Sequence, residues 1–236
     1  MKVTALIPAA GIGSRMETNI PKQFLTLAGQ PVVVHALQIF EAAPEVQEIF
    51  LMVPPGLEDR CRKDWVEAFG LKKVAKLISG GASRQDSVYE GLRATTSDTD
   101  IILVHDGVRP FVTRTMIRQA IEGASRYDGA VVAIAVNDTP KTADAGGRIS
   151  ATLDRSSLWL AQTPQAFKRK VLMEAYRQAY TEGVIQTDDA ALVERLGYRV
   201  QIIPGAWDNL KITQPEDLSL GEQILKMRER SSLQGS

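Results

Sequence analysis

The chain has 236 residues, a length that suits one α/β domain or two small ones. Its 28 Lys and Arg residues balance its 28 Asp and Glu residues, which argues against a general binder of nucleic acid or of membrane surfaces. Its one cysteine, Cys61, excludes a disulfide framework and a cysteine-rich zinc site. Apolar stretches fall short of the ~18 residues that a membrane span needs. We therefore expect a soluble cytoplasmic protein.

Five short, continuous apolar runs are typical of strands buried on both faces of a sheet. They are Val3–Pro8, Ile49–Val53, Val74–Ser79, Ile101–His105 and Ala130–Val136. Segments with helical periodicity lie between them. This alternation predicts an α/β fold with a mostly parallel sheet covered by helices on both faces. In such sheets ligands bind beyond the carboxyl ends of the strands, so the loops after the strands are where function should lie.

The alternation stops at Asn137, where a polar segment begins that runs to Asp154. The pair Gly146-Gly147 at its centre predicts a hairpin turn. A hairpin with so few apolar residues cannot bury a face by itself. It is therefore either an arm supported by another subunit or a surface loop.

Beyond this arm we expect a helix near Lys170–Glu182, a helix at Asp188–Leu196 capped by Thr187, and a strand at Arg199–Ile203. A last helix begins within Thr213–Glu216. We expect one domain over residues 1–230, with the protruding β-arm at about 137–154 and a flexible tail at 231–236.

The first segment with chemical potential is Pro8–Met16, directly after the first strand. Its small residues and glycines let backbone N–H groups approach an anion closely. Arg15 follows the glycines, and Lys22 lies close behind in the sequence, so that two cations flank a glycine turn and suit a triphosphate. The spacing is not that of a dinucleotide fingerprint or of a Walker loop. The alternative is an ordinary tight turn with solvated basic residues.

The second segment, Gly80–Ser87, follows the third strand. Gly80 and Gly81 permit close backbone approach to a flat base or a sugar, and Ser87 can hydrogen-bond to either. The alternative is a glycine turn that leads into a helix with a capping box made by Ser83 and Asp86.

The third segment is His105–Pro110, at the end of the fourth strand. Asp106 is well placed to hold Mg²⁺, and Arg109 could meet a phosphate in a bidentate manner. Alternatively, Asp106 caps the turn and Arg109 is solvated. His105 lies in an apolar strand and is expected to be a hydrogen-bonded core residue. With His35 as the only other histidine, a histidine-based metal site or triad is not expected.

The fourth segment is Asp208–Thr213. Asp208 could complete a metal site with Asp106, and Lys211 could face the same anion as Lys22. Taken alone, the segment is also consistent with a short strand that carries surface charges.

Together and in this order, these segments resemble the sugar-nucleotide cytidylyltransferases, and most closely the 2-C-methyl-D-erythritol 4-phosphate cytidylyltransferases of non-mevalonate isoprenoid biosynthesis. The family patterns include P-A-A-G-x-G-x-R-M, P-K-Q, G-G-x-x-R-x-x-S-V, H-D-x-x-R-P and D-N-x-K-[IV]-T. The matching residues are Pro8–Met16, Pro21–Gln23, Gly80–Val88, His105–Pro110, Asp138–Lys141, Asp154–Gln165 and Asp208–Thr213. The resemblance covers about residues 2 to 228.

The resemblance implies a Rossmann-like nucleotidyltransferase that uses CTP and a divalent cation such as Mg²⁺, and that forms a homodimer by exchanging arms. The implied nucleotide contacts are Ala9, Ala10, Gly11, Gly13, Gly81, Ala82, Ser87 and Asp106, with Arg15, Lys22 and Lys211 as catalytic cations. The implied acceptor contacts are Arg109, Thr163 and Thr187, together with Thr139 and Arg155 from the opposite subunit.

The reaction that the resemblance implies is in-line attack of the acceptor phosphate on the α-phosphorus of CTP, with release of pyrophosphate. Two alternatives remain open. One is a cytidylyltransferase for ribitol 5-phosphate or an acidic sugar, which shares most of these motifs. The other is a non-catalytic nucleotide-binding module with a regulatory role.

Overall fold

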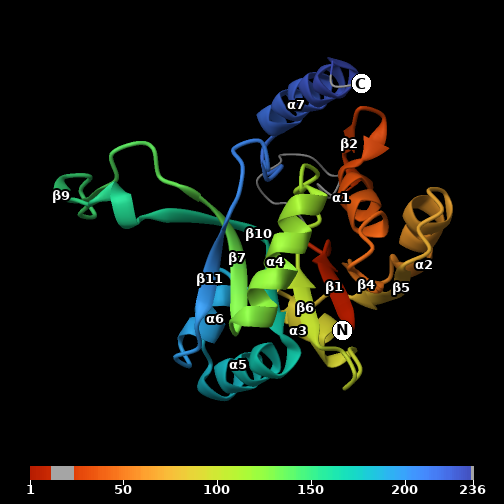
Figure 1. Cartoon of the computed structure of the whole chain (residues 1–236), viewed down its shortest axis with the longest axis horizontal. Helices are drawn as coiled ribbons and strands as arrows, with labels where there is room; N and C mark the ends of the chain where they lie inside the picture. The colour runs from red at the N-terminus through yellow and green to blue at the C-terminus, as the bar shows by residue number, and fades with distance from the viewer. Residues whose placement is uncertain (12–23, 235–236) are drawn as a thin grey trace.

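The computed structural model describes residues 1–11 and 24–234. Within these residues, the core is a seven-stranded sheet in the order β11-β7-β10-β6-β1-β4-β5 (Figure 1). All neighbouring strands run parallel except β10, which is antiparallel to both β6 and β7. The expected mostly parallel sheet is thus confirmed. The strands of this sheet are β1 Val3–Pro8, β4 Glu48–Val53, β5 Val74–Ser79, β6 Ile101–Val104, β7 Gly129–Ala135, β10 Trp159–Lys168 and β11 Val200–Pro204.

Helices cover both faces of this sheet because successive side chains of each strand point to opposite faces. On β1, the side chains of Val3, Ala5 and Ile7 join the core under α1, α2 and α4. The side chain of Leu6 joins the opposite core, under α3, α5 and α6. The helices are α1 Val32–Glu41, α2 Glu58–Cys61 continued by a π-helical stretch Arg62–Glu67, α3 Arg84–Arg93, α4 Arg114–Arg126, α5 Arg169–Glu182, α6 Asp189–Glu194 and α7 Pro215–Gln234.

The last helix, α7, lies apart from the two main cores (Figure 1). Its Ile224 packs in a smaller apolar cluster with Leu27, Phe111 and Ile212. Leu27 belongs to a short hairpin formed by β2 Thr26–Leu27 and β3 Gln30–Pro31. α7 runs to Gln234, and so enters the segment 231–236 that was expected to be a flexible tail. Residues 235–236 lie outside the described part of the chain.

The strand β10 is the element that the sequence did not predict. Its first residues, Trp159–Ala161, are exposed, and Pro164 lacks the N–H that an interior strand needs. The register with β7 shifts between Ala161 and Gln165, and this irregularity accommodates the proline. Because the segment Gln162–Gln165 separates the apolar residues at the two ends of the strand, no continuous apolar run of strand length reveals it.

The expected helix ends are mostly confirmed. Ser83 caps α3, and its side chain and that of Asp86 form the reciprocal capping box. Thr113 caps α4 by accepting from the N–H of Met116. The expected cap of α6 is wrong: Asp188, not Thr187, accepts from the backbone of the helix.

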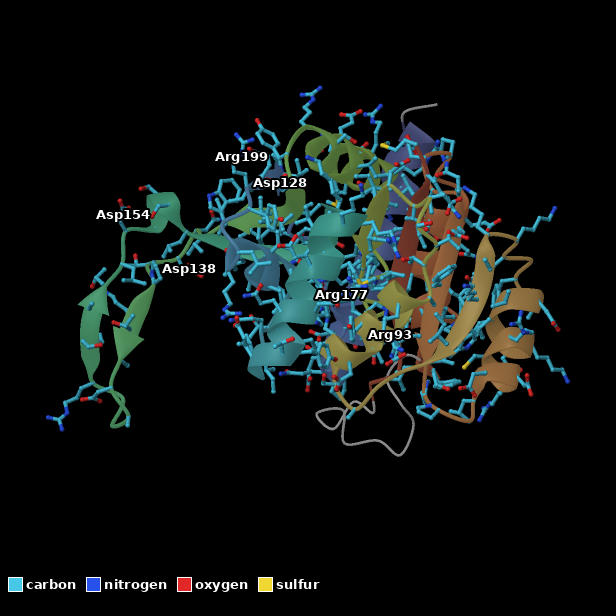
Figure 2. The ribbon with its side chains drawn as sticks, turned by 90° about the horizontal axis from the view of Figure 1, so that it is seen from below. Arg93, Asp128, Asp138, Asp154, Arg177 and Arg199 are labelled. Atoms are coloured by element: carbon cyan, nitrogen blue, oxygen red, sulfur yellow. The ribbon has the colours of Figure 1, made fainter. Side chains whose placement is uncertain are left out.

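The polar segment after β7 forms a hairpin arm, as its Gly-Gly pair indicated. Strand β8 (Lys141–Ala143) pairs antiparallel with β9 (Ile149–Thr152), and both are fully exposed. A short 3₁₀ helix, Arg155–Ser157, leads from the arm back to β10. The arm stands away from the body of the chain, with Asp138 and Asp154 at its base (Figure 2). None of the described helices is both long and apolar enough to cross a membrane.

Candidate active site

The turns after β1 and β5 line one cavity of about 540 Å³ at the carboxyl edge of the sheet. Parallel strands bring their carboxyl ends to the same edge, so segments far apart in the sequence meet there. The residues that line it include the expected nucleotide contacts Ala9, Ala10, Gly11, Gly81, Ala82, Ser87 and Asp106, together with Lys211. The structure brings this set together; that it holds a nucleotide stays a prediction.

The two turns pack closely because both carry residues with little or no side chain. A Cβ atom added to Gly80 would lie 2.1 Å from the Cβ of Ala10, and one added to Gly81 would lie 2.3 Å from the Cβ of Asp86. The Ser87 hydroxyl holds the second turn, since it accepts from the N–H of Gly81 at 3.1 Å and donates to a backbone carbonyl. Small residues therefore let two stretches of backbone form one wall of the cavity.

Asp106, just beyond β6, is the centre of the charged part of the site. One of its carboxylate oxygens, Oδ1, accepts from Nε of Arg84 at 2.9 Å. The other, Oδ2, lies 2.7 Å from Nζ of Lys211 and 3.5 Å from Nε of Arg109. The carboxylate is 8% exposed, so these ion pairs are well shielded from solvent.

These cations decide the charge state of Asp106. Burial by itself would raise the pKa of the carboxyl, but Arg84, Lys211 and Arg109 outweigh burial and hold the pKa far below its ordinary value. Asp106 is therefore ionised at every ordinary pH. Because the cations also outnumber the carboxylates that contact them, the cluster keeps an excess of positive charge that attracts anions.

A second cavity of about 210 Å³ adjoins the first. The expected acceptor contacts Arg109, Thr163 and Thr187 line it. Arg84, Asp106 and Lys211 line both cavities. The charged cluster thus forms a wall where the contents of the two cavities would meet.

Thr163 and His105 support this wall from within. Nε2 of His105 lies 3.0 Å from the carbonyl oxygen of Arg109, and because a carbonyl only accepts, Nε2 carries the proton. Nδ1 then accepts from the Thr163 hydroxyl at 3.0 Å, while the same hydroxyl oxygen accepts from the N–H of Asp106 at 3.1 Å. His105 is thus a hydrogen-bonded core residue, as expected from its place in an apolar strand.

Some predicted residues lie elsewhere or outside the described structure. Thr139 and Arg155 belong to the arm, and neither lines one of these two cavities in its own chain. Arg155 donates to the carbonyl of Asn137 at the base of the arm. Gly13, Arg15 and Lys22 fall outside the described residues, so their roles remain predictions.

The expected metal pair of Asp106 and Asp208 finds no support. The carboxylate of Asp208 accepts from Nη2 of Arg228 at 2.7 Å, and Asp208 lines neither cavity. The structure thus places Asp208 in an ion pair with Arg228 of α7. Among residues 1–11 and 24–234, three or more potential metal ligands gather nowhere.

Comparison with known proteins identifies the family of this chain. Residues 3–227 match the family model described as 2-C-methyl-D-erythritol 4-phosphate cytidylyltransferase. The chain belongs to this cytidylyltransferase family. Its relatives include the enzyme of that name from Geobacter metallireducens, which is 48% identical over 96% of this chain and 98% of the relative. The relative of the same name from Geotalea uraniireducens is 46% identical over 96% of this chain and 97% of its own length.

Solved structures of the family share the fold. The crystal structure of the cytidylyltransferase from Thermus thermophilus has a TM-score of 0.79 and 35% identity, over 96% of this chain and all of that one. The 4-diphosphocytidyl-2C-methyl-D-erythritol synthase from Anaerococcus prevotii has a TM-score of 0.84 and 28% identity, over 95% and 96% of the two chains.

The sequence reasoning assigned no role to Asp189, nor to Arg84, although Arg84 is the arginine of the pattern G-G-x-x-R-x-x-S-V. Arg84 joins Asp106 to the fully buried Asp189, whose Oδ2 accepts from Nη2 of Arg84 at 2.8 Å. One signal could have found Arg84: it is a cation in the first turn of a helix, where the helix dipole disfavours positive charge. Such a residue needs an anionic partner, but the sequence alone does not say which one.

The buried His105 makes stability depend on pH. Burial lowers the pKa of His105 from 6.5 to about 4, so between these values the unfolded chain binds a proton that the folded chain does not. The free energy of unfolding should therefore fall as the pH falls through this window, by about 2 kcal/mol from His105 between pH 7 and pH 5. Urea unfolding of wild type and His105→Asn measures this slope; parallel pH profiles would contradict the assignment.

Proposed function

We propose that this chain joins CTP and 2-C-methyl-D-erythritol 4-phosphate to give 4-diphosphocytidyl-2-C-methyl-D-erythritol and pyrophosphate. The observation that carries the proposal is the wall shared by the two cavities, where Arg84, Asp106 and Lys211 border both. Two anions that repel each other need such a place to meet. Membership of the cytidylyltransferase family supports this choice of the two substrates.

The chemistry requires positioning and fixed positive charge more than proton transfer. An oxygen of the acceptor phosphate attacks the α-phosphorus of CTP, a new P–O bond forms, and the bond to the β-phosphate oxygen breaks. A phosphate monoester is already ionised near pH 7, so the attack needs no general base. This suits a site whose nearest histidine, His105, is buried and neutral. Lys211 stabilises the developing negative charge.

A divalent cation such as Mg²⁺ belongs to the same proposal. Mg²⁺ is usually held by one or two carboxylates together with substrate phosphates. Within the described part of the chain, Asp106 is the carboxylate that lines the nucleotide cavity. Asp106 would share the ion with phosphate oxygens, and the ion would supply further positive charge to the triphosphate. Asp208 is left out because it lines neither of the two cavities.

The proposal also includes a homodimer in which arms are exchanged. The two strands of the arm are fully exposed, and an isolated two-stranded hairpin is marginal in water. Large apolar side chains are exposed on the arm and on the first residues of β10 that follow it: Ile149 is 67% exposed, Leu160 51% and Trp159 42%. A second copy that covers them would bring Thr139 and Arg155 to the acceptor cavity of its partner.

Pyrophosphate release measured with each of four nucleoside triphosphates tests the proposal, with methylerythritol phosphate and ribitol phosphate as acceptors. We expect turnover with CTP and methylerythritol phosphate only. Faster turnover with ribitol 5-phosphate would overturn the choice of acceptor. Binding of CTP without pyrophosphate release from either acceptor would favour the regulatory alternative.

Replacing Lys211 with alanine removes a cation from the shared wall. Because one such preorganised donor stabilises a transition state by about 3–4 kcal/mol, kcat should fall about a hundredfold or more. The KM for CTP should change less, since the charge acts mainly in the transition state. Steady-state kinetics of Lys211→Ala measures both, with the exposed Lys63→Ala as control. A loss confined to KM would contradict the assigned role.

The arm exchange has a test in mixed dimers. Arg155→Ala and Lys211→Ala subunits should each form inactive homodimers, because every site then lacks one residue. In a mixed dimer, one of the two sites regains both residues, so purified heterodimers should reach about half of the wild-type activity. Heterodimers isolated by two affinity tags give this number directly. If they stay as inactive as the homodimers, Arg155 acts within its own chain or not at all.

A further inference from the structure

Arg84 occupies the wall between the two cavities in an unusual way. It is the first residue of α3 and follows the glycine turn after β5. Its guanidinium spans two carboxylates: Nε donates to Asp106 at 2.9 Å, and Nη2 donates to Asp189 at 2.8 Å. One of these carboxylates belongs to the site, and the other lies behind it.

Asp189, which accepts a hydrogen bond from Arg84, is shielded from solvent. It is the first residue of α6 and is fully buried. One oxygen accepts from Arg84, and the other accepts from the hydroxyl of Tyr176 on α5. A series of contacts therefore runs from Tyr176 through Asp189 and Arg84 to Asp106, and ends at Lys211.

The start of α6 is itself fastened to the sheet. The side-chain amide of Gln165 on β10 donates to Asp188 at 2.9 Å and accepts from the N–H of Ala190 at 3.1 Å. These bonds lie on both sides of Asp189 in the sequence, so its backbone is held in place. Gln85, next to Arg84, bonds to the loop before α6 at two backbone groups.

Electrostatics keep Arg84 and Tyr176 in the protonation states that these contacts require. Burial would lower the pKa of Arg84, but Asp189 and Asp106 outweigh it and raise the pKa, so the guanidinium stays charged. Burial and the neighbouring Asp189 both raise the pKa of Tyr176, so its hydroxyl stays protonated and donates.

The arrangement determines how the carboxylate of Asp106 is turned. Arg84 contacts one oxygen and Lys211 contacts the other. If Arg84 moved, Asp106 could rotate, and Lys211 would lose its fixed partner. A buried ion pair such as Arg84 with Asp189 contributes little to stability compared with apolar packing of the same volume. Its geometry, however, orients a group that the reaction needs.

We propose that Arg84, held by Asp189 and Tyr176, is a positioning residue that orients Asp106 and thereby places Lys211 for the transfer. This inference rests on the proposed cytidylyl transfer. It differs from a purely structural role in one respect: a structural role lowers stability and the amount of folded protein, but leaves kcat per folded site unchanged.

Two substitutions test this series of contacts at increasing distance from the reactants. Asp189→Asn keeps the shape but weakens the hold on Arg84, and should lower kcat about tenfold or more because small displacements of catalytic groups are costly. Tyr176→Phe removes one hydroxyl and should lower kcat about fivefold. The matched control is Tyr180→Phe on the same helix. It removes a hydroxyl that donates to Asp86 rather than to Asp189, and should leave kcat unchanged.

The decisive measurement combines these changes with Lys211→Ala, with kcat expressed per folded site by CTP-binding stoichiometry. If Asp189 acts through Lys211, then adding Asp189→Asn or Tyr176→Phe to Lys211→Ala should lower kcat no further, within about twofold. Fully additive losses would overturn the proposal, as would unchanged kcat in both single variants. If Asp189→Asn does not fold, Tyr176→Phe alone still tests the proposal.

A spectroscopic readout separates this proposal from the proposed function. The Nε–H group of Arg84, assigned in ¹H–¹⁵N spectra by its loss in Arg84→Lys, should give a sharp, slowly exchanging signal in wild type and in Tyr180→Phe. The signal should broaden in Asp189→Asn. An inactive wild type with this pattern would overturn the proposed function and leave the orientation of Arg84 established. An averaged Arg84 signal in wild type would overturn the positioning role itself.

Discussion

The buried carboxylate of Asp106 is the constraint on which the rest of the site depends. Removing a carboxylate from water costs several kcal/mol unless cations and hydrogen bonds compensate. Here the compensation comes from Arg84, Arg109 and Lys211, which belong to separate stretches of the chain. The fold must bring these stretches together for Asp106 to be tolerated. The same convergence places positive charge where two anionic reactants would meet.

The sheet makes this convergence possible. Parallel strands end at one edge, so the turns after β1, β5 and β6 become neighbours although they are far apart in the sequence. Glycine and alanine let two of these turns pack with almost no space between them. A phosphate site requires positive charge and close approach of the backbone. At this edge of the sheet, the cations around Asp106 supply the charge, and glycine and alanine allow the close approach.

The arm differs from the body of the chain in what stabilises it. Both of its strands are exposed along their whole length, whereas the strands of the central sheet pack against the two main cores. The body is therefore stabilised by its own packing, and the arm needs support from elsewhere. In the homodimer that we propose, this division would let Arg155 act at the site of the other subunit.

Local pattern in the sequence was enough to predict the apolar strands, the glycine turns and the arm, because each of these depends on short-range packing. The positions that surround the larger cavity came from the resemblance to a known family. Local pattern did not predict β10, because the polar residues and the proline of Gln162–Gln165 interrupt its apolar residues inside the sheet. The ionic partners came from the folded arrangement instead. Arg84 meets Asp189 across 105 positions of sequence, and Asp208 turns to Arg228 rather than to Asp106. A charge in a sequence has many potential partners, and only the packing of helices against the sheet selects one.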